Sequence, residues 1–106
     1  MTSSPIPRVL STFRRHGVKA LLMGGQACIL YGAAEFSRDV DVAVAVSPAN
    51  LDRLRAALAD LDAEPLLYPP LDAAALRRGH ACHFRCRAPG LHGIRVDVMG
   101  VFRGVT

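Results

Sequence analysis

Two acidic residues, Asp39 and Asp41, stand two positions apart in a run that alternates with valine. Side chains two apart on a β-strand emerge on one face, so both carboxylates are expected on one side, with Cα atoms about 6.5 Å apart. Like charges held this close raise each other's pKa unless a cation lies between them. Mg²⁺ prefers such oxygen ligands. The pair therefore indicates a candidate metal site, although solvated acids at a strand end produce the same pattern.

A third acid, Asp97, lies between Val96 and Val98 in a second alternating segment. An unpaired carboxylate would be costly to bury there. If this segment forms a strand beside the first, the three carboxylates converge. Such a cluster can hold one or two metal ions that clamp the attacking and leaving oxygens of a phosphoryl transfer. The alternative is a surface ion pair between Asp97 and Arg95 or Arg103.

Gly24 and Gly25 follow a short apolar run and precede a short helix predicted over residues 26–32. Glycines let the backbone approach a ligand closely, and the amides at the start of a helix attract anions. The two glycines are therefore a candidate phosphate site. A tight strand-to-helix turn without a ligand would use the same residues.

The elements that must position these residues fit one domain spanning residues 1–106. Alternation of valine predicts a strand from Asp39 to Val46, and Ser47-Pro48 predicts the start of a helix that a leucine stripe continues to about residue 62. The other predicted elements are a helix over 5–16 with Ser4 as N-cap, a buried strand over 18–23, a loop over 64–79 with a helical turn at 73–78, and strands over 81–87 and 93–101 joined as a hairpin. The order α-β-α-β-α-β-β implies an α/β (α+β) fold, a mixed sheet with helices packed on it.

Composition permits a phosphate-bearing partner but does not demand one. The formal charge is +4, and nearly all of the positive charge is arginine, since Lys19 is the only lysine. Arginine suits phosphate because its planar fork donates two parallel hydrogen bonds. The N-terminus does not resemble a signal peptide, and the longest apolar stretch is too short to span a bilayer. We expect a soluble, cytoplasmic protein with no membrane partner.

Four potential zinc ligands lie close together: His80, Cys82, His83 and Cys86. On a strand, however, Cys82 and Cys86 face one way and His83 the other, so the four cannot converge tetrahedrally. We expect no zinc, and we expect the cysteines, including Cys28 in the short helix, to be small core residues. An odd number of cysteines also argues against a disulfide framework. His83, Arg85 and Arg87 would then share the opposite face, where they can meet a substrate phosphate.

Met23-Gly24-Gly25, then Asp39-Val40-Asp41-Val42, then Val96-Asp97-Val98 resembles the nucleotidyltransferase superfamily of DNA polymerase beta. That family has a hydrophobic residue before Gly and Gly or Ser, an Asp-x-Asp or Asp-x-Glu strand about a dozen residues later, and a third acid on a later strand. The resemblance spans roughly residues 18–100. Tyr31-Gly32 and Ser37-Arg38 are further similar to bacterial minimal nucleotidyltransferases and AbiEii-type toxin proteins of toxin–antitoxin and phage-defence systems.

The resemblance implies a specific activity: Mg²⁺-dependent transfer of a nucleoside monophosphate from an NTP to a hydroxyl of RNA, protein or a small molecule. It implies Asp39 and Asp41 as ligands of two Mg²⁺ ions, and Asp97 as the third ligand or as the base that activates the acceptor. It also implies an antitoxin as partner. The nucleotide-binding residues that it implies, with the first two carrying the β- and γ-phosphates, are Gly24, Gly25, Gln26, Ser37 and Arg38.

The sequence departs from the family pattern where many members have Arg four residues, and Thr two residues, before the first Asp. Here Glu35 and Ser37 occupy those positions. Ser37 keeps the hydroxyl, but Glu35 replaces a phosphate-binding cation with an anion, for which Arg38 can compensate. Little chain follows Asp97 to bind an acceptor. One alternative is a catalytically degraded module of the same fold that binds a nucleotide or a partner. Another is a basic nucleic-acid-binding domain, although this sequence offers no stacking aromatics to support it.

Overall fold

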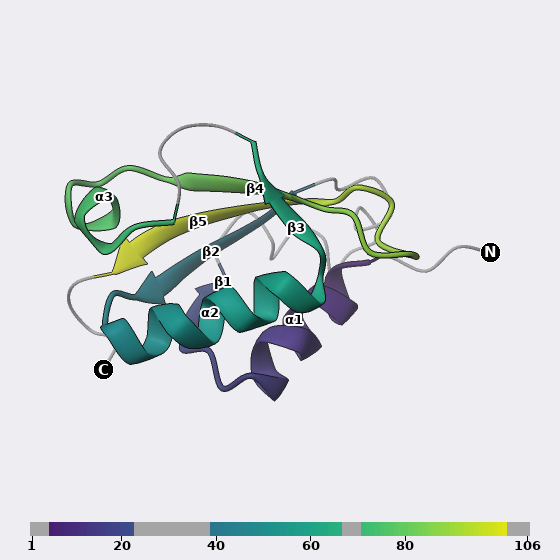
Figure 1. Cartoon of the computed structure of the whole chain (residues 1–106), viewed down its shortest axis with the longest axis horizontal. Helices are drawn as coiled ribbons and strands as arrows, with labels where there is room; N and C mark the ends of the chain where they lie inside the picture. The colour runs from purple at the N-terminus through teal and green to yellow at the C-terminus, as the bar shows by residue number, and fades with distance from the viewer. Residues whose placement is uncertain (1–4, 23–38, 67–70, 102–106) are drawn as a thin grey trace.

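The computed structural model describes residues 5–22, 39–66 and 71–101. Within these residues the strands form one five-stranded mixed sheet of order β1-β2-β5-β4-β3. Strands β2 and β5 are parallel, and every other neighbouring pair is antiparallel. The elements are α1 (Ile6–Arg15), β1 (Ala20–Leu22), β2 (Asp39–Ala45), α2 (Pro48–Asp60), β3 (Ala63–Pro65), α3 (Ala73–Arg77), β4 (Cys82–Cys86) and β5 (Arg95–Val101) (Figure 1). The described chain is therefore a mixed α/β fold.

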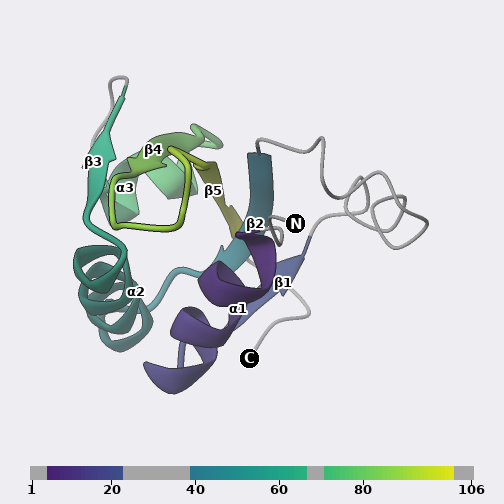
Figure 2. The same cartoon turned by 90° about the vertical axis from the view of Figure 1, so that its right-hand side faces the viewer.

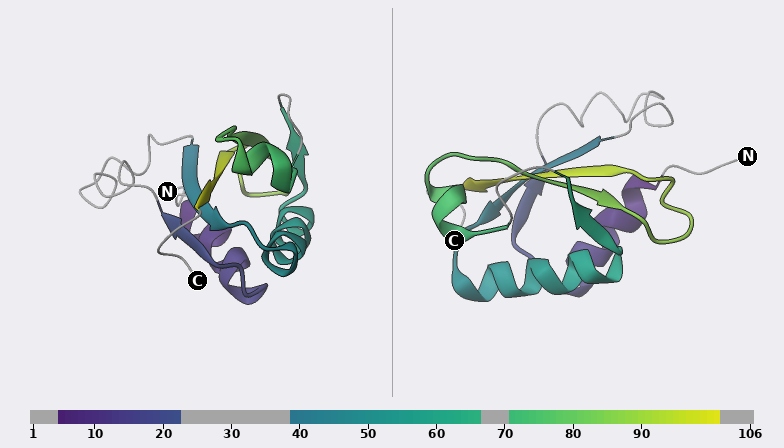
Figure 3. Two further views of the ribbon diagram at one scale, coloured as in Figure 1. Left: turned by 90° about the vertical axis from the view of Figure 1, so that its left-hand side faces the viewer. Right: turned by 45° about the horizontal axis from the view of Figure 1, so that its top comes forward.

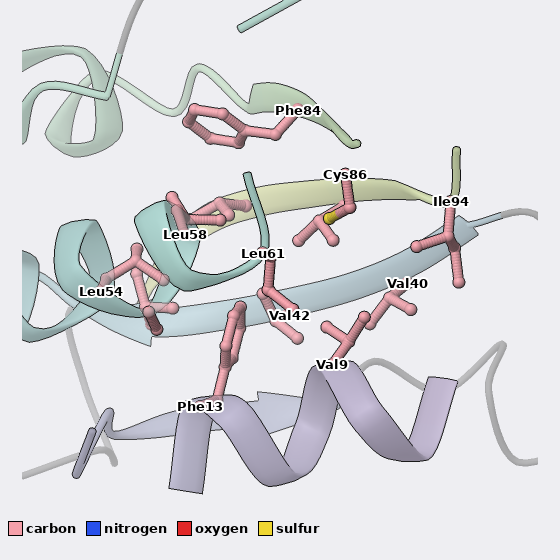
Figure 4. Close-up of a cluster of buried hydrophobic side chains, with 14 of the residues drawn as sticks. Val9, Phe13, Val40, Val42, Leu54, Leu58, Leu61, Phe84, Cys86 and Ile94 are labelled. Carbon is pink, nitrogen blue, oxygen red and sulfur yellow. The ribbon is translucent and has the colours of Figure 1, made fainter. Parts of the chain in front are cut away.

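Helices α1 and α2 pack on one side of the curved sheet (Figure 2). We call this side the valine face, because Val40 and Val42 of β2 point into the core between the sheet and the two helices (Figure 4). Val9 and Phe13 of α1 and Leu54 of α2 are almost wholly buried there. Burying a side chain of this size stabilises a fold by about 1.5–3 kcal/mol. Aliphatic packing thus provides most of the stabilisation of this sheet.

The short helix α3 also lies on the valine face, because its Leu76 packs on Gly100 of β5. A Cβ added at Gly100 would lie 3.2 Å from the Leu76 Cβ atom and 2.8 Å from a Val46 methyl carbon. Such distances leave no room for a side chain. Every helix of the described part therefore covers the valine face, and the three acids Asp39, Asp41 and Asp97 lie on the opposite face of the sheet.

Buried Asn50 ties the edge strand β1 to the central strand β2. Its Oδ1 accepts a hydrogen bond from the Lys19 amide at 2.7 Å, and its Nδ2 donates to the carbonyls of Lys19 and Ala45 at 3.0 and 2.8 Å. The amide of Asn50 also donates to the Ser47 hydroxyl at 3.2 Å, which caps α2 as predicted. One side chain thus joins the start of α2 to both strands.

Strand β2, helix α2 and the β4–β5 hairpin confirm the sequence-based predictions. Gly90 and Gly93, in the connection between β4 and β5, have φ angles of +85° and +68°. These left-handed conformations favour glycine. The hairpin therefore forms where the Pro-Gly turn predicts it. In the described part, no helix is long and apolar enough to cross a membrane.

Three predicted elements differ in the structure. Helix α1 begins at Ile6 with Pro5 at the N-cap position and no side-chain cap, so the predicted cap at Ser4 is wrong. The first strand was expected to be buried, but β1 is a short edge strand with Leu21 and Leu22 exposed at 53% and 45%. Strand β3 lies where a loop was predicted, since a proline is tolerated at a sheet edge. The described order therefore contains β3 in addition to the predicted elements, whereas helix α3 lies where the helical turn at 73–78 was predicted. The predicted helix over 26–32 lies outside the described residues.

Candidate active site

The parallel pairing of β2 with β5 brings the acidic residues of two strands together. Asp41 is the register partner of Asp97, and Asp39 is the partner of Arg95. Figures 1 and 3 show the two strands side by side along the middle of the sheet. The condition under which the three carboxylates were expected to converge, a strand with Asp97 beside the Asp39–Asp41 strand, is therefore met. We call the face opposite the valine face the polar face; it carries Asp39, Asp41, His83, Arg85, Arg95 and Asp97.

The carboxyl groups of Asp41 and Asp97 share a hydrogen bond. Two carboxyl groups can bond in this way only when one of them carries a proton. Burial raises the pKa of Asp41, and the hydrogen bond and negative charge of Asp97 raise it further. Of the two acids, Asp41 is therefore the one that keeps its proton to the higher pH.

Two basic side chains bind the same oxygen of Asp97. Its Oδ1 lies 2.9 Å from Arg95 Nε and 2.6 Å from His83 Nδ1. The His83 Nδ1 also lies 3.3 Å from Arg95 Nη2, but it cannot donate to Asp97 and accept from Arg95 at once. We assign its proton to the shorter contact. The ion pair with Arg95 that the sequence offered as an alternative is therefore present.

These contacts set the charge of Asp97, whose side chain is only 16% exposed. Burial would raise the pKa of Asp97, but the hydrogen bonds from Arg95 and His83 outweigh it and hold that pKa below its usual value. Asp97 therefore loses its proton at a lower pH than Asp41 does. The environments of the two neighbouring acids push their pKa values apart.

Asp39 lies on the polar face at the exposed start of β2. Its negative charge contributes to the raised pKa of Asp41. Of the three predicted acids, the structure thus brings Asp41 and Asp97 into contact and sets Asp39 beside them. Asp39 therefore adds negative charge next to the Asp41–Asp97 pair.

The carboxyl pair fits a hard divalent cation in its chemistry. Both groups offer oxygen, and the negative charges of Asp97 and Asp39, which contribute to the raised pKa of Asp41, are ones that a cation would neutralise. Among the residues that the structure describes, however, no group of three or more His, Cys, Asp and Glu side chains is arranged to hold a metal ion. Asp41 and Asp97 are therefore the two candidate ligands that contact each other, with Asp39 as an exposed third.

The sequence analysis missed the contact of His83 with Asp97 and the position of Glu64 on β3. Both follow from register: His83 pairs with Asp97 across β4 and β5, and Glu64 pairs with Arg85 across β3 and β4. Alternation had already put His83 and Asp97 on compatible faces. The missing signal was the register of the hairpin, which its turn geometry determines.

The two cysteines of β4 lie on the valine face, opposite His83, as the alternation predicts. Cys82 and Cys86 are buried, and neither forms a disulfide within the described residues. Burial raises the pKa of Cys86 to about 11, which makes it a poor nucleophile at neutral pH. His80 is exposed after α3. The cysteines and His83 therefore cannot share a metal.

Several predicted site residues lie outside the described residues, and the phosphate-binding half of the predicted site is among them. They are Gly24, Gly25, Gln26, Glu35, Ser37, Arg38 and, beyond β5, Arg103. Cys28 lies outside them as well. The described site consists of the acids and their basic neighbours.

Comparison of this chain with protein-family models, with curated proteins and with solved structures gives no match. Function is therefore inferred from the chemistry of the polar face. That face combines a pair of carboxyl groups on adjacent strands, an exposed acid and two arginines.

Proposed function

We propose that this chain is a Mg²⁺-dependent nucleotidyltransferase that transfers a nucleoside monophosphate from an NTP to an acceptor hydroxyl. The observation that carries the proposal is the contact of Asp41 with Asp97 on adjacent parallel strands, with Asp39 two residues earlier on the same face. An Asp-x-Asp strand beside a strand bearing a third acid is the arrangement that the motif resemblance implies. The mixed five-stranded sheet is compatible with it.

In this proposal Asp41, Asp97 and the more exposed Asp39 together would hold the metal ion. Bound Mg²⁺ would neutralise the charge that develops on the transferred phosphoryl group. The acceptor oxygen forms a bond to the α-phosphorus, the bond to the bridging oxygen breaks, and pyrophosphate leaves. The lowered pKa of Asp97 makes it a weak base, so we assign it the role of ligand, and the hydroxyl proton passes to solvent.

Arg95 and His83 orient Asp97 by binding its Oδ1. A ligand held by hydrogen bonds keeps one orientation as the metal exchanges. A bound cation would favour the charged form of Asp41, whose pKa is raised in its absence. Metal affinity is therefore expected to rise with pH.

A second candidate function is a catalytically inactive module that binds a nucleotide or a partner. The observation that favours it is that Arg95 already supplies positive charge to Asp97, whose Oδ1 also lies 2.6 Å from His83 Nδ1. A carboxylate whose charge is already balanced by a neighbouring side chain has less need of a metal ion to neutralise it. This reading would also accommodate Glu35 in the segment before β2.

The test is a transfer assay with each of the four α-³²P-labelled NTPs, Mg²⁺ and, as acceptors, total RNA or the protein itself. Metal-dependent labelling of an acceptor by the wild type, lost in Asp41→Asn, supports the transferase. Metal-dependent nucleotide binding without labelling supports the binding module. Labelling that is equal in the wild type and Asp41→Asn would overturn the assignment of the site.

A further inference from the structure

Two arginines stand opposite each other on the polar face, beside the acids. Arg85 of β4 and Arg95 of β5 are register partners in the antiparallel pair. Like charges directly opposite on neighbouring strands destabilise a sheet. An anion that contacts both guanidinium groups would turn this repulsion into attraction.

The two guanidinium groups differ in how far they are already engaged. Arg95 donates a hydrogen bond from Nε to Asp97, and its Nη2 lies close to His83 Nδ1. Arg85 donates from Nη1 to the Gly93 carbonyl at 2.9 Å, and this is its only hydrogen-bond acceptor among the described residues. A guanidinium has five N–H donors, so Arg85 retains most of its hydrogen-bonding capacity.

The acid nearest to Arg85 is bound elsewhere. Glu64 is the register partner of Arg85 across β3 and β4, but its carboxylate accepts a hydrogen bond from Arg87 at 2.6 Å. That bond, with a smaller contribution from Arg85, lowers the pKa of Glu64. Arg85 therefore has carboxylates near it but forms an ion pair with none of the described ones.

We propose that Arg85 and Arg95 bind a phosphate group on the polar face, next to the Asp41–Asp97 pair. The inference rests on the proposed function, since it assigns a phosphate subsite to the same site. Arginine forks bind phosphate oxygens in bidentate fashion, and two opposed arginines suit a group with several acceptor oxygens. Arg95 and Asp97 are two residues apart on one strand, about 6.5 Å between Cα atoms, so the bound phosphate adjoins the acids.

This phosphate group has two possible sources, the NTP and the backbone of an RNA acceptor. The test therefore measures two ligands with the intact chain: a fluorescein-labelled single-stranded RNA of about 12 nucleotides in EDTA, and a fluorescent ATP analogue with Mg²⁺. The variants are Arg85→Gln, which removes the charge, and Arg85→Lys, which keeps it but removes the fork. The matched control is Arg53→Gln, an exposed arginine on α2.

We expect Arg85→Gln to weaken binding of at least one ligand about tenfold, Arg85→Lys to weaken it less, and Arg53→Gln to leave it unchanged. For RNA, the slope of log K against log salt concentration should also fall by about 0.7, the value for one lost phosphate contact on a single strand. Thermal denaturation of each variant checks that it is folded. Should Arg85→Gln fail to fold, Arg85→Lys carries the test.

Each outcome has a defined meaning. Loss confined to RNA identifies an acceptor phosphate, loss confined to the ATP analogue identifies a nucleotide phosphate, and either supports the subsite. The subsite is overturned if the wild type binds neither ligand, if folded Arg85 variants bind both as the wild type does, or if Arg53→Gln loses as much. Arg85-dependent RNA binding without any Mg²⁺–ATP binding would contradict the proposed function while the subsite stands.

Discussion

Replacing Asp41 with asparagine should stabilise the protein in the absence of metal. Asp41 lies against ionised Asp97 and near Asp39, and both charges raise its pKa. Asparagine has no charge, and its amide can donate a hydrogen bond to the Asp97 carboxylate. The substitution therefore removes repulsion and keeps the contact.

The expected gain is small but measurable. Relief of a like-charge pair opposite one another on neighbouring strands is worth about 0.2–1 kcal/mol. For a domain of this size, 1 kcal/mol shifts the melting temperature by about 4–8 °C. Asp41→Asn should therefore melt about 1–8 °C higher than the wild type at pH 7 in EDTA.

The pH dependence identifies the cause of that gain. A carboxyl group whose pKa is raised on folding contributes stability below its ordinary pKa, and this contribution is lost as the pH rises through the raised value. The Asp41→Asn gain should therefore be present at pH 7 and disappear near pH 4, where Asp41 is protonated.

Differential scanning calorimetry of the wild type, Asp41→Asn and the control Asp52→Asn gives the answer. Asp52 is an exposed acid on α2 that pairs with Arg55 at 3.0 Å, so its substitution should be neutral or slightly destabilising. An Asp41→Asn protein that melts below the wild type at pH 7, or a gain that does not change with pH, would refute the account of the carboxyl pair.

Three further predictions concern the fold. A hydrogen bond of 2.6 Å between His16 and Asp60 lowers the pKa of the Asp60 carboxyl. The stability that this interaction contributes is therefore present above the ordinary pKa of the carboxyl and is lost as the pH falls. Asp60→Asn should consequently narrow the difference in urea midpoint between pH 6 and pH 3. Because burial raises the pKa of Cys86 to about 11, mass spectrometry should find it unmodified by iodoacetamide at pH 8 in the folded protein and alkylated in urea. Gly100→Ala places a Cβ 2.8 Å from a Val46 methyl carbon. It should lower the free energy of unfolding, measured by urea denaturation, by about 1–3 kcal/mol. An unchanged urea midpoint would show that the site has room.

Local patterns predicted the elements that contain their own signals. Alternating valines determined β2, and Ser47 with the leucine stripe determined α2, because capping and amphipathic spacing act within a few residues. Edge strands carry no such signal. The exposure of β1 depends on where it lies in the sheet, and β3 depends on pairing with β4, which is distant in sequence.

The site was predictable to the same extent. The shared face of Asp39 and Asp41 follows from the period of a strand, and the position of Asp97 beside them needed only that β5 lies next to β2. The contacts of Arg95 and His83 with Asp97 depend on rotamers and on the β4–β5 register, which spacing within one strand does not contain. Those contacts hold the pKa of Asp97 below its usual value, while that of Asp41 is raised.

The most direct test of the proposed metal site is a Mn²⁺ titration followed by the electron paramagnetic resonance signal of the free ion. Mn²⁺ prefers the same oxygen ligands as Mg²⁺ and is detected without a nucleotide. The wild type should bind Mn²⁺ at pH 7, more tightly than at pH 4, and Asp41→Asn should lose this binding while Asp52→Asn retains it. Mn²⁺ binding that is absent in the wild type, or equal in the wild type and Asp41→Asn, would contradict the assignment of the carboxyl pair as a metal site.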